Sequence, residues 1–476
     1  MTQVLRSALD ELRGTFTGQV ITQEDSAYDT ARVVWNAEID RHPAMIARCL
    51  NPTDVSAAII FARQQRLEIS VRGGAHNMSG SAVDDAGLMI DLSQLREVTV
   101  DLAGRRARVG GGALLADMDA ATQAHGLATP SGLVSHTGVG GLTLGGGMGW
   151  LTRKFGMAID NLIAAEIVVA DGKILRAAAD ENPELFWAIR GGGGNFGVVT
   201  SFEFQLHKVG PLIEFGLFFW GLDQGTEVLR MARDVIGTLP RDVNAVIAGL
   251  HAPPAPFVPE QHHFRPGYAL LVTGFGSAEE HAAVATRIRE AVPPLFELAT
   301  PMPYVELQQL LDEASAWGQF GYEKSCYVEE LSDDAIAVIT DQLPRKSSPR
   351  SVLLFYTLDG AYSQVGDDDT AFGGGRSPRY AIIISGLAST PELLAADRVW
   401  VRSFWDALRP YAIGIGSYIN GMTEFEDDRV RASYGAAKYQ RLARIKAEYD
   451  PDNAFHRNAN IKPSATHSST IRATMT

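Results

Sequence analysis

Three glycine-rich segments, at residues 73–80, 138–149 and 191–197, restrict the fold of this chain more than any other feature of the sequence. A glycine inside a helix or strand destabilises that element by about 0.5–1 kcal/mol relative to alanine, so regular elements tolerate few of them. Each segment taken alone could be a tight turn. Together they indicate loops whose backbone approaches one long cofactor at several places, because exposed backbone N–H groups bind phosphate well.

The usual nucleotide-binding motifs do not account for these segments. A GxGxxG pattern runs from Gly192 to Gly197, but it leads into a predicted strand, VVTSFEFQLH, instead of opening a helix after one. The Rossmann fingerprint requires the reverse context, and the P-loop pattern GxxxxGK[ST] does not occur in the sequence. The cofactor site is therefore expected in a fold of another kind.

Alternating apolar patterns predict short strands and helices over residues 1–207. The predicted strands are 44–50, 67–72, 88–93, 97–100, 106–110 and 198–207, the predicted helices are 52–66, 113–125 and 182–190, and 161–179 forms a hairpin turning at Asp171-Gly172. From 208 to about 415 the patterns are broken and proline is more frequent. We predict an α+β fold with domains at 1–207 and 208–415 and a C-terminal segment at 416–476.

Charge and cysteine content narrow the class of protein. The formal net charge of -14 argues against a nucleic-acid partner, which requires clustered Lys and Arg. The sequence has no signal-peptide core and no run of about 18 apolar residues, so we expect a cytoplasmic protein without a membrane partner. Cys49 and Cys326 form no disulfide framework, and no metal motif such as HExxH occurs, so no metal is expected. The oligomeric state stays open, with a homodimer as one option.

Four segments in fixed order resemble one known family. They are VRGGAHNMSG (71–80), GLVSHTGVGGLTLGGGMGWLTRKFGMAIDNL (132–162), ELFWAIRGGGGNFGVVTSFEF (184–204) and YDPDNAFHRNANI (449–461). Together they resemble the berberine-bridge-enzyme-like FAD-linked oxidases of the vanillyl-alcohol-oxidase superfamily, which have a PCMH-type FAD-binding domain. Residues 128–151 are most similar to the bacterial EncM-like subgroup, which includes an oxygenase of enterocin biosynthesis.

This resemblance implies how the three parts of the chain are used. Residues 1–207 would be an FAD-binding domain of two α+β subdomains. Residues 208–415 would be a substrate-binding domain whose antiparallel sheet, flanked by helices, covers the isoalloxazine ring. Residues 416–476 would return to the FAD-binding domain.

The resemblance also implies a covalent flavin. The loop at 72–80 would wrap the FAD diphosphate, and His76 would be bonded to the 8α carbon of the flavin; its imidazole, with an ordinary pKa of about 6.5, is mostly neutral and nucleophilic. Many relatives form a second link from a cysteine at a position that is Val134 here, so we expect a single covalent link and a smaller or more enclosed substrate than a saccharide. The cofactor-binding residues implied are Arg72, Gly73, Gly74, Ala75, His76, Asn77, Met78, Ser79, Thr137, Gly138, Gly140, Gly141, Gly145, Gly147, Gly197, Val199, Tyr418, Asn420, Asn458 and Asn460.

Two sets of residues are assigned to the surroundings of the flavin by the same resemblance. Thr137 would face the N5 edge where oxygen meets the ring, or its hydroxyl would only satisfy a loop backbone group. We interpret the neighbouring His136 as a loop or packing residue. Tyr418 and Asn420 would lie near the pyrimidine end and the floor of the site, together with the two asparagines at 458 and 460, which could instead cap a turn.

The catalytic base is the least determined residue. Relatives commonly carry a carboxylate in an ExxGGA-like stretch, which here is YTLDGA and places Tyr356 at that position. Either Tyr356 acts as a phenolate or hydrogen-bonding group, or another residue such as Glu323 supplies the base. Tyr356, Tyr418 and Thr137 are the predicted catalytic residues.

These features predict an FAD-dependent oxidase that transfers hydride from a small organic or secondary-metabolite substrate to flavin N5, with molecular oxygen as the acceptor. Three alternatives remain: an EncM-like monooxygenase of natural-product biosynthesis, a dehydrogenase that passes electrons to a quinone or protein, and a non-redox flavin-binding cyclase. Peroxide yield, labelled oxygen in the product and bleaching of the flavin without air distinguish them.

Overall fold

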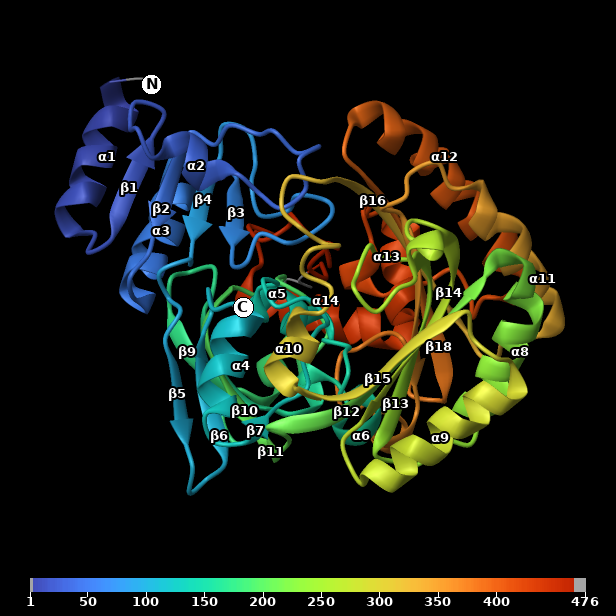
Figure 1. Cartoon of the computed structure of the whole chain (residues 1–476). Helices are drawn as coiled ribbons and strands as arrows, with labels where there is room; N and C mark the ends of the chain where they lie inside the picture. The colour runs from blue at the N-terminus through green and yellow to red at the C-terminus, as the bar shows by residue number, and fades with distance from the viewer. Residues whose placement is uncertain (1–2, 466–476) are drawn as a thin grey trace, which may run out of the picture.

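Two sheets are built from the first half of the chain, at the left of Figure 1. The computed structural model describes residues 3–465. The four-stranded sheet has the order β1 (Gln19–Thr22), β2 (Met45–Arg48), β4 (Leu88–Asp91), β3 (Ile69–Arg72). The five-stranded sheet has the order β5 (Val98–Asp101), β6 (Arg106–Gly110), β10 (Val198–Gln205), β8 (Leu162–Val168), β9 (Ile174–Ala178). The helices of this half are α1 (Gln3–Thr15), α2 (Tyr28–Arg32), α3 (Pro52–Gln65), α4 (Leu115–Gln123), α5 (Val139–Gly145), α6 (Thr152–Phe155) and α7 (Pro183–Ile189).

Helix α3 connects two strands that run parallel, as the sequence predicts. Its first turn is capped by Asn51, whose side chain accepts a hydrogen bond from the Asp54 N–H, and Pro52 occupies the first turn, where its missing N–H costs nothing. The helix ends at Arg66, which adopts the left-handed conformation. Strands β2 and β3 both pair with β4 in parallel, and parallel neighbours require a crossover of this kind.

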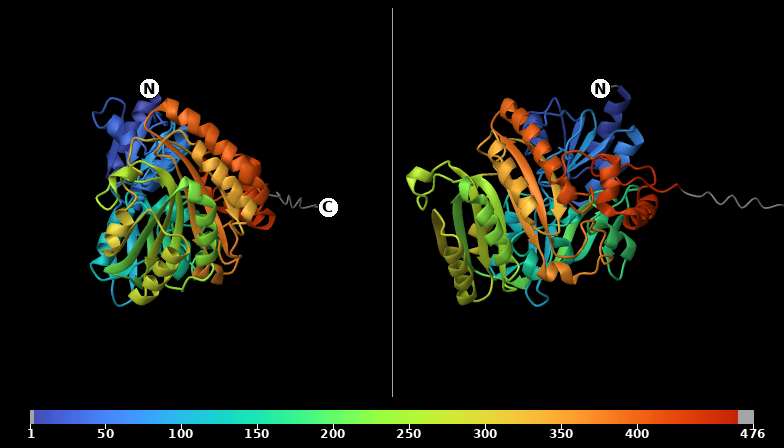
Figure 2. Two further views of the ribbon diagram at one scale, coloured as in Figure 1. Left: turned by 45° about the vertical axis from the view of Figure 1, so that its right-hand side comes forward. Right: turned by 90° about the vertical axis from the view of Figure 1, so that its right-hand side faces the viewer.

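The second half of the chain forms one antiparallel seven-stranded sheet, with the order β15-β12-β14-β13-β17-β18-β16. Its strands are β12 (Leu212–Gly221), β13 (Val243–His251), β14 (Pro266–Gly274), β15 (Phe296–Pro303), β16 (Phe320–Val328), β17 (Val352–Leu358) and β18 (Arg379–Ala388). Helices α8 (Gly225–Ile236), α9 (Ala278–Ala291), α11 (Asp333–Gln342) and α12 (Pro391–Leu408) pack on its outer face (Figures 1 and 2). Leu353, Phe355, Ile382 and Ile384 point into this helical layer.

The chain then crosses back to its first half. Helix α13 (Asp427–Tyr434) and helix α14 (Ala436–Tyr449) pack in the same apolar core as α7 and β10, where Leu442 and Ile445 join Trp187 and Phe196. Strands β7 (Leu127–Ala128) and β11 (His207–Lys208) form a separate antiparallel pair, and the predicted domain boundary at residue 207 falls within β11. Helix α10 (Tyr304–Gln309) follows β15. Residues 466–476 of the C-terminal segment lie outside the described part of the chain.

The predicted α+β class is confirmed, and so are the predicted strands and helices of the first half. The domain boundaries at 207 and 415 stay predictions. Within residues 3–465 no helix is both long and apolar enough to cross a membrane, and no three His, Cys, Asp or Glu side chains come together as metal ligands.

A buried acid joins the two halves of the molecule. Asp119 of α4 is 1% exposed and accepts a hydrogen bond from the Gln308 Nε2 of α10 (3.0 Å), which also lies 2.9 Å from the Ser131 hydroxyl. The second carboxyl oxygen of Asp119 has no partner among the described residues. Burial raises the pKa of Asp119 to about 7, so the protonated acid is the form that fits this site.

Replacing Asp119 by asparagine should therefore raise the free energy of unfolding above neutral pH by roughly 2–4 kcal/mol. The folded wild type keeps this proton up to about pH 7, whereas the unfolded chain releases it near the ordinary value of 3.8. Wild-type stability must then fall as the pH rises through this window, and the amide removes that contribution. The urea midpoints of the wild type and of Asp119→Asn at pH 5 and pH 8 measure this difference in stability. The same pH dependence in both proteins would contradict the prediction.

Candidate active site

A cavity of about 420 Å³ lies between the two halves of the molecule and the C-terminal segment. All three glycine-rich segments contribute to its wall, with residues 73–78, 137–138, 140–142, 193–195 and 197. The inner face of the seven-stranded sheet contributes alternate residues of β17 and β18, which are Val352, Leu354, Tyr356, Ile383, Ser385 and Leu387, together with Glu323 of β16. Successive side chains of a strand point to opposite faces of the sheet, so one face lines the cavity and the other packs against the helical layer.

Two of the glycine loops touch each other backbone to backbone. A Cβ atom on Gly74 would lie 2.3 Å from the Gly138 nitrogen, and a Cβ atom on Gly138 would lie 2.4 Å from the Gly74 nitrogen. Any side chain at either position would push the loops apart, because no flexible atom is there to move. Glycine is needed here for close approach of two loops, and both glycines line the cavity.

The lining carries few ionisable side chains. Among the described lining residues, only His76, Glu323, Tyr356 and Tyr418 titrate, and no Lys or Arg lines the cavity. A bound phosphate would thus depend on backbone N–H groups, which glycine loops supply. The Oδ1 atoms of Asn458 and Asn460 are buried and have no partner among the described residues. Asn458 lines the cavity, so its Oδ1 can accept a hydrogen bond from a bound group. A cavity with glycine walls, few ionisable side chains and an unpartnered amide oxygen at Asn458 fits an FAD molecule.

Most of the predicted site residues meet in this cavity. Those in its lining are Gly73, Gly74, Ala75, His76, Asn77, Met78, Thr137, Gly138, Gly140, Gly141, Gly197, Val199, Tyr356, Tyr418, Asn420 and Asn458. Arg72, Ser79, Gly145, Gly147 and Asn460 lie outside the lining. Arg72 donates instead to the carbonyls of Ala31 and Val33, and the Gly147 N–H donates to the Tyr418 hydroxyl.

His76 is fixed on two sides. Its ring stacks on Trp35 with centroids 4.9 Å apart, and its Nε2 lies 3.1 Å from the Nδ1 of His136. Burial, with the neighbouring His136 as the second cause, lowers the pKa of His76 to about 3, so the imidazole is neutral. The sequence interpretation of His136 as a loop or packing residue gave no sign of this contact, because the two histidines are far apart in the chain.

Glu323 is the only carboxylate among the described lining residues. It accepts a hydrogen bond from the Ser385 hydroxyl (3.0 Å), and its remaining accessible surface faces the cavity instead of open solvent. Burial raises the pKa of Glu323 to about 7, which suits a group that takes up and releases a proton near neutrality.

The two tyrosines of the cavity remain phenols at neutral pH. Burial raises the pKa of Tyr356, and Tyr418 and Glu323 raise it further. Burial also raises the pKa of Tyr418, whose oxygen accepts hydrogen bonds from the Gly147 N–H and the Asn420 amide, both at 3.0 Å. Tyr356 is therefore a neutral phenol at neutral pH, whereas the pKa of Glu323 is about 7.

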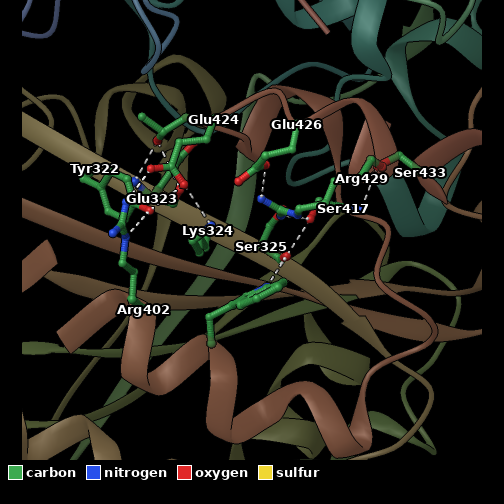
Figure 3. A network of polar contacts seen from close by, with 12 residues as sticks. Tyr322, Glu323, Lys324, Ser325, Arg402, Ser417, Glu424, Glu426, Arg429 and Ser433 are labelled. Atoms are coloured by element: carbon green, nitrogen blue, oxygen red, sulfur yellow. Dashed lines mark hydrogen bonds and ion pairs between the residues drawn. The ribbon is translucent and has the colours of Figure 1, made fainter. Parts of the chain in front are cut away.

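A polar network behind the cavity joins β16, which carries Glu323, to the C-terminal segment around Glu424 (Figure 3). The Glu323 N–H donates to the Thr423 hydroxyl (2.9 Å), which donates back to the Glu323 carbonyl (3.1 Å). On the opposite face of β16, Lys324 and Arg402 bind Glu424 at 3.1 and 2.5 Å. Because β16 is one of the two edge strands of the sheet, the C-terminal segment occupies an edge that would otherwise lack hydrogen-bond partners.

Comparisons with known proteins agree with this geometry. The family profile described as "FAD binding domain" matches residues 43–178, and the profile "Berberine and berberine like" matches residues 417–462. An FAD-linked oxidoreductase of Dictyostelium discoideum is 31% identical over 432 residues, 90% of this chain and 91% of the relative. The (R)-6-hydroxynicotine oxidase of Paenarthrobacter nicotinovorans is 30% identical over 461 residues, 94% of this chain and 97% of the relative.

Solved structures show the same fold. The crystal structure of 6-hydroxy-D-nicotine oxidase from Arthrobacter nicotinovorans superposes with a TM-score of 0.83 at 27% identity, and the match covers 94% of this chain and 98% of that one. Glucooligosaccharide oxidase from Acremonium strictum, described with a 6-S-cysteinyl, 8α-N1-histidyl FAD, superposes with a TM-score of 0.84 at 23% identity, over 96% and 99% of the two chains. At that identity the second likeness concerns the fold alone.

Proposed function

Because this chain belongs to the berberine-like FAD-linked oxidoreductases, and so is an enzyme, we propose that it is an oxidase that dehydrogenates a small organic molecule and uses molecular oxygen as the acceptor. The observation that carries this proposal is Glu323, the one carboxylate among the described lining residues, beside two neutral tyrosines in a cavity walled by three glycine loops. An oxidation of this kind requires one proton acceptor at the reacting carbon's O–H or N–H group, and the cavity offers one.

The glycine loops would hold the cofactor. Backbone N–H groups of residues 73–78 and 137–141 would bind the diphosphate, and the amides of Asn420 and Asn458 would contact the flavin. His76 would form the single covalent link, since Val134 offers no thiol. When bound, FAD accepts two electrons and a hydrogen from the substrate and returns the electrons to molecular oxygen, which becomes hydrogen peroxide.

The side chains of the sheet and the C-terminal segment would handle the substrate. Glu323 removes the proton from the substrate's hydroxyl or amine group. The Tyr418 oxygen already accepts two hydrogen bonds, so its own hydrogen is free to be donated to the substrate. Tyr356 contacts the substrate as a neutral phenol and fixes its orientation.

The lining also limits the substrate class. Val352, Leu354, Ile383 and Leu387 offer apolar contacts, and no basic side chain among the described lining residues could pair with an anion. We therefore propose a small, largely apolar alcohol or amine, neutral or cationic in solution. The hydroxynicotine oxidase relative, whose name indicates a nitrogen heterocycle, is in keeping with this class.

Anaerobic mixing tests the proposed reaction. A panel of apolar alcohols and amines should contain a compound that bleaches the yellow flavin without air, and readmitted oxygen should restore the colour with one peroxide per turnover. Labelled oxygen in the product would identify a monooxygenase instead. Slow aerobic recovery with fast reduction of a quinone would identify a dehydrogenase, and product formed without bleaching would contradict the redox assignment.

A further inference from the structure

The outer edge of strand β16 is bound by side chains at the two positions closest to the cavity. The strand lies at the end of the seven-stranded sheet, next to β18, so the backbone groups of alternate residues point away from the sheet. At Gly321 and at Glu323, one side chain binds both the N–H and the C=O of the residue. Asn36 makes this contact at Gly321, and Thr423 makes it at Glu323.

Asn36 joins β16 to the first glycine-rich segment, and it is fully buried. Its Oδ1 accepts from the Gly321 N–H (2.9 Å), and its Nδ2 donates to the carbonyls of Gly321 (3.0 Å) and Met78 (2.8 Å). The Oδ1 also accepts from the Glu38 N–H (3.2 Å), so the two donors and two lone pairs of the amide are all used. Because Met78 lines the cavity, one side chain ties the cavity wall to the strand that carries Glu323.

Thr423 joins the same strand to the C-terminal segment. Its hydroxyl accepts from the N–H of Glu323 (2.9 Å) and donates to the carbonyl of the same residue (3.1 Å). Tyr418 and Asn420, which line the cavity, come just before Thr423 in the chain. Only a side chain that both donates and accepts can make this pair of bonds, so an apolar side chain of the same shape could not replace it.

Packing alone would not fix the position of β16. A Cβ atom on Gly321 would lie 2.5 Å from the Met78 sulfur and 3.2 Å from the Trp35 ring. Trp35, Met78 and Leu387 form a small apolar cluster at this contact, and all three line the cavity. Apolar attraction is not directional, whereas the hydrogen bonds of Asn36 require one distance and one direction. The hydrogen bonds therefore define the register between the two halves.

We propose that Asn36 and Thr423 are positioning residues that together hold Glu323 in its place beside the cofactor. The glycine-rich segments and Glu323 belong to different halves of the molecule, and a displacement of about 1 Å can slow a reaction by about 10²-fold. This inference rests on the proposed function, in which Glu323 is the base. It goes further, because it assigns a function to two residues outside the cavity lining.

Substitutions that keep the shape of each side chain test this proposal. Thr423→Val removes both bonds of the hydroxyl, whereas Thr423→Ser keeps them. Asn36→Asp keeps the acceptor oxygen and removes both donated bonds. With FAD-loaded full-length proteins, flavin reduction at saturating substrate without air should slow by about 10–10²-fold in Thr423→Val and Asn36→Asp. Thr423→Ser should stay near the wild-type rate, and KM should change much less than this rate in all three variants.

A second measurement needs no substrate. Ionisation of Glu323 places a negative charge in the cavity, so it should shift the absorption bands of the bound flavin, with a midpoint at about pH 7. Lys324 and Arg402 bind Glu424 on the opposite face of β16. The other titrating side chains of the lining stay neutral near this pH, and they are His76, Tyr356 and Tyr418.

The midpoint reports how well the edge of β16 stays closed over Glu323. If the edge loosens, water reaches the carboxyl, and the midpoint should fall toward the ordinary glutamate value of 4.5. We expect this fall in Thr423→Val and Asn36→Asp but not in Thr423→Ser. Glu323→Gln should show no such shift of the flavin bands.

Thr357→Val and Asn161→Asp are the matched controls. Thr357 is a buried residue of β17 whose hydroxyl donates to the Ala245 carbonyl (2.9 Å). Asn161 is buried, and its amide donates to the carbonyls of Phe155 and Met157, both at 2.9 Å. Both residues lie outside the cavity lining, so both variants should keep the wild-type rate and midpoint.

The outcomes separate this inference from its premise. Wild-type rates and midpoints in Thr423→Val and Asn36→Asp would overturn it, and so would equal losses in Thr423→Ser or in the controls. A wild-type flavin without a midpoint near pH 7 would also overturn it, because Glu323 would then not lie beside the flavin. Normal flavin reduction by Glu323→Gln, with the midpoints as expected, would refute Glu323 as the base and still support its positioning.

Discussion

Replacing Glu323 by glutamine should lower kcat by about 10²–10⁴-fold while the protein still binds FAD, because the described lining residues then include no carboxylate to take up the substrate proton. Glutamine keeps the size of the side chain and can still accept the hydrogen bond from Ser385. The backbone of residue 323 stays bound to Thr423 in both proteins. Stopped-flow measurement of flavin reduction without air measures the loss directly.

The pH profile should move with the same residue. With the pKa of Glu323 raised to about 7, the carboxyl is protonated and inactive as a base at lower pH, so wild-type kcat/KM should rise as the pH passes through 7. In Glu323→Gln this rise should disappear. Tyr356→Phe should keep it and lose less activity, since burial holds Tyr356 as a neutral phenol.

A matched change tests specificity. Glu330→Gln alters an exposed glutamate just beyond the end of β16 and should leave both the rate and the pH profile unchanged. Near-normal flavin reduction by Glu323→Gln would show that the base lies elsewhere, and equal losses in the two glutamine variants would point to a general effect of charge.

Replacing Lys446 by methionine should cost about 3–5 kcal/mol of unfolding free energy, the usual effect of removing one partner of a buried ion pair. Lys446 forms an ion pair with Asp450, in which the Lys446 Nζ lies 2.6 Å from the Asp450 Oδ2. Both side chains are 0% exposed. The ammonium group also donates to the carbonyls of Asn195 (2.6 Å) and Phe455 (2.9 Å). Without it, a carboxylate and two carbonyls are left buried with fewer partners.

The same substitution should weaken FAD binding. Lys446 connects the third glycine-rich segment, through Asn195, with the chain that leads from Phe455 to Asn458, and both Asn195 and Asn458 line the cavity. Urea unfolding of Lys446→Met and of the wild type measures the loss of stability. The FAD dissociation constant is compared between His76→Ala and the double variant His76→Ala with Lys446→Met, because the proposed covalent link is absent from both. Lys462→Met is the control: its ion pair with Asp427 is exposed, so it should change stability by less than about 1 kcal/mol. Equal losses in the two lysine variants would contradict the role of burial.

The sequence by itself determined the elements whose signals are local. Asn51 and Pro52 specify the start of α3, Asp171-Gly172 specifies a hairpin, and the three glycine-rich segments specify loops, all of which contribute to the wall of one cavity. The resemblance to berberine-like FAD-linked oxidases, carried by these segments, is confirmed by the family profiles and relatives. The strands of the seven-stranded sheet were harder to predict from the sequence. Strands such as β13 and β18 are buried on both faces, so they lack the alternation of polar and apolar residues that marks a strand.

Only the tertiary structure decided which side chains meet. The close approach of Gly74 and Gly138 brings His136 against His76, although the two histidines belong to separate loops. The register of β16 against β18 places Glu323 opposite Ser385 on the cavity face, and this position is the ground on which we propose Glu323 as the base. Arg72, predicted at the cofactor, binds backbone carbonyls outside the lining. The physical reason is the same in each case: strand register and loop contacts join residues far apart in the chain, and a one-residue change of register would turn a side chain to the other face of its sheet.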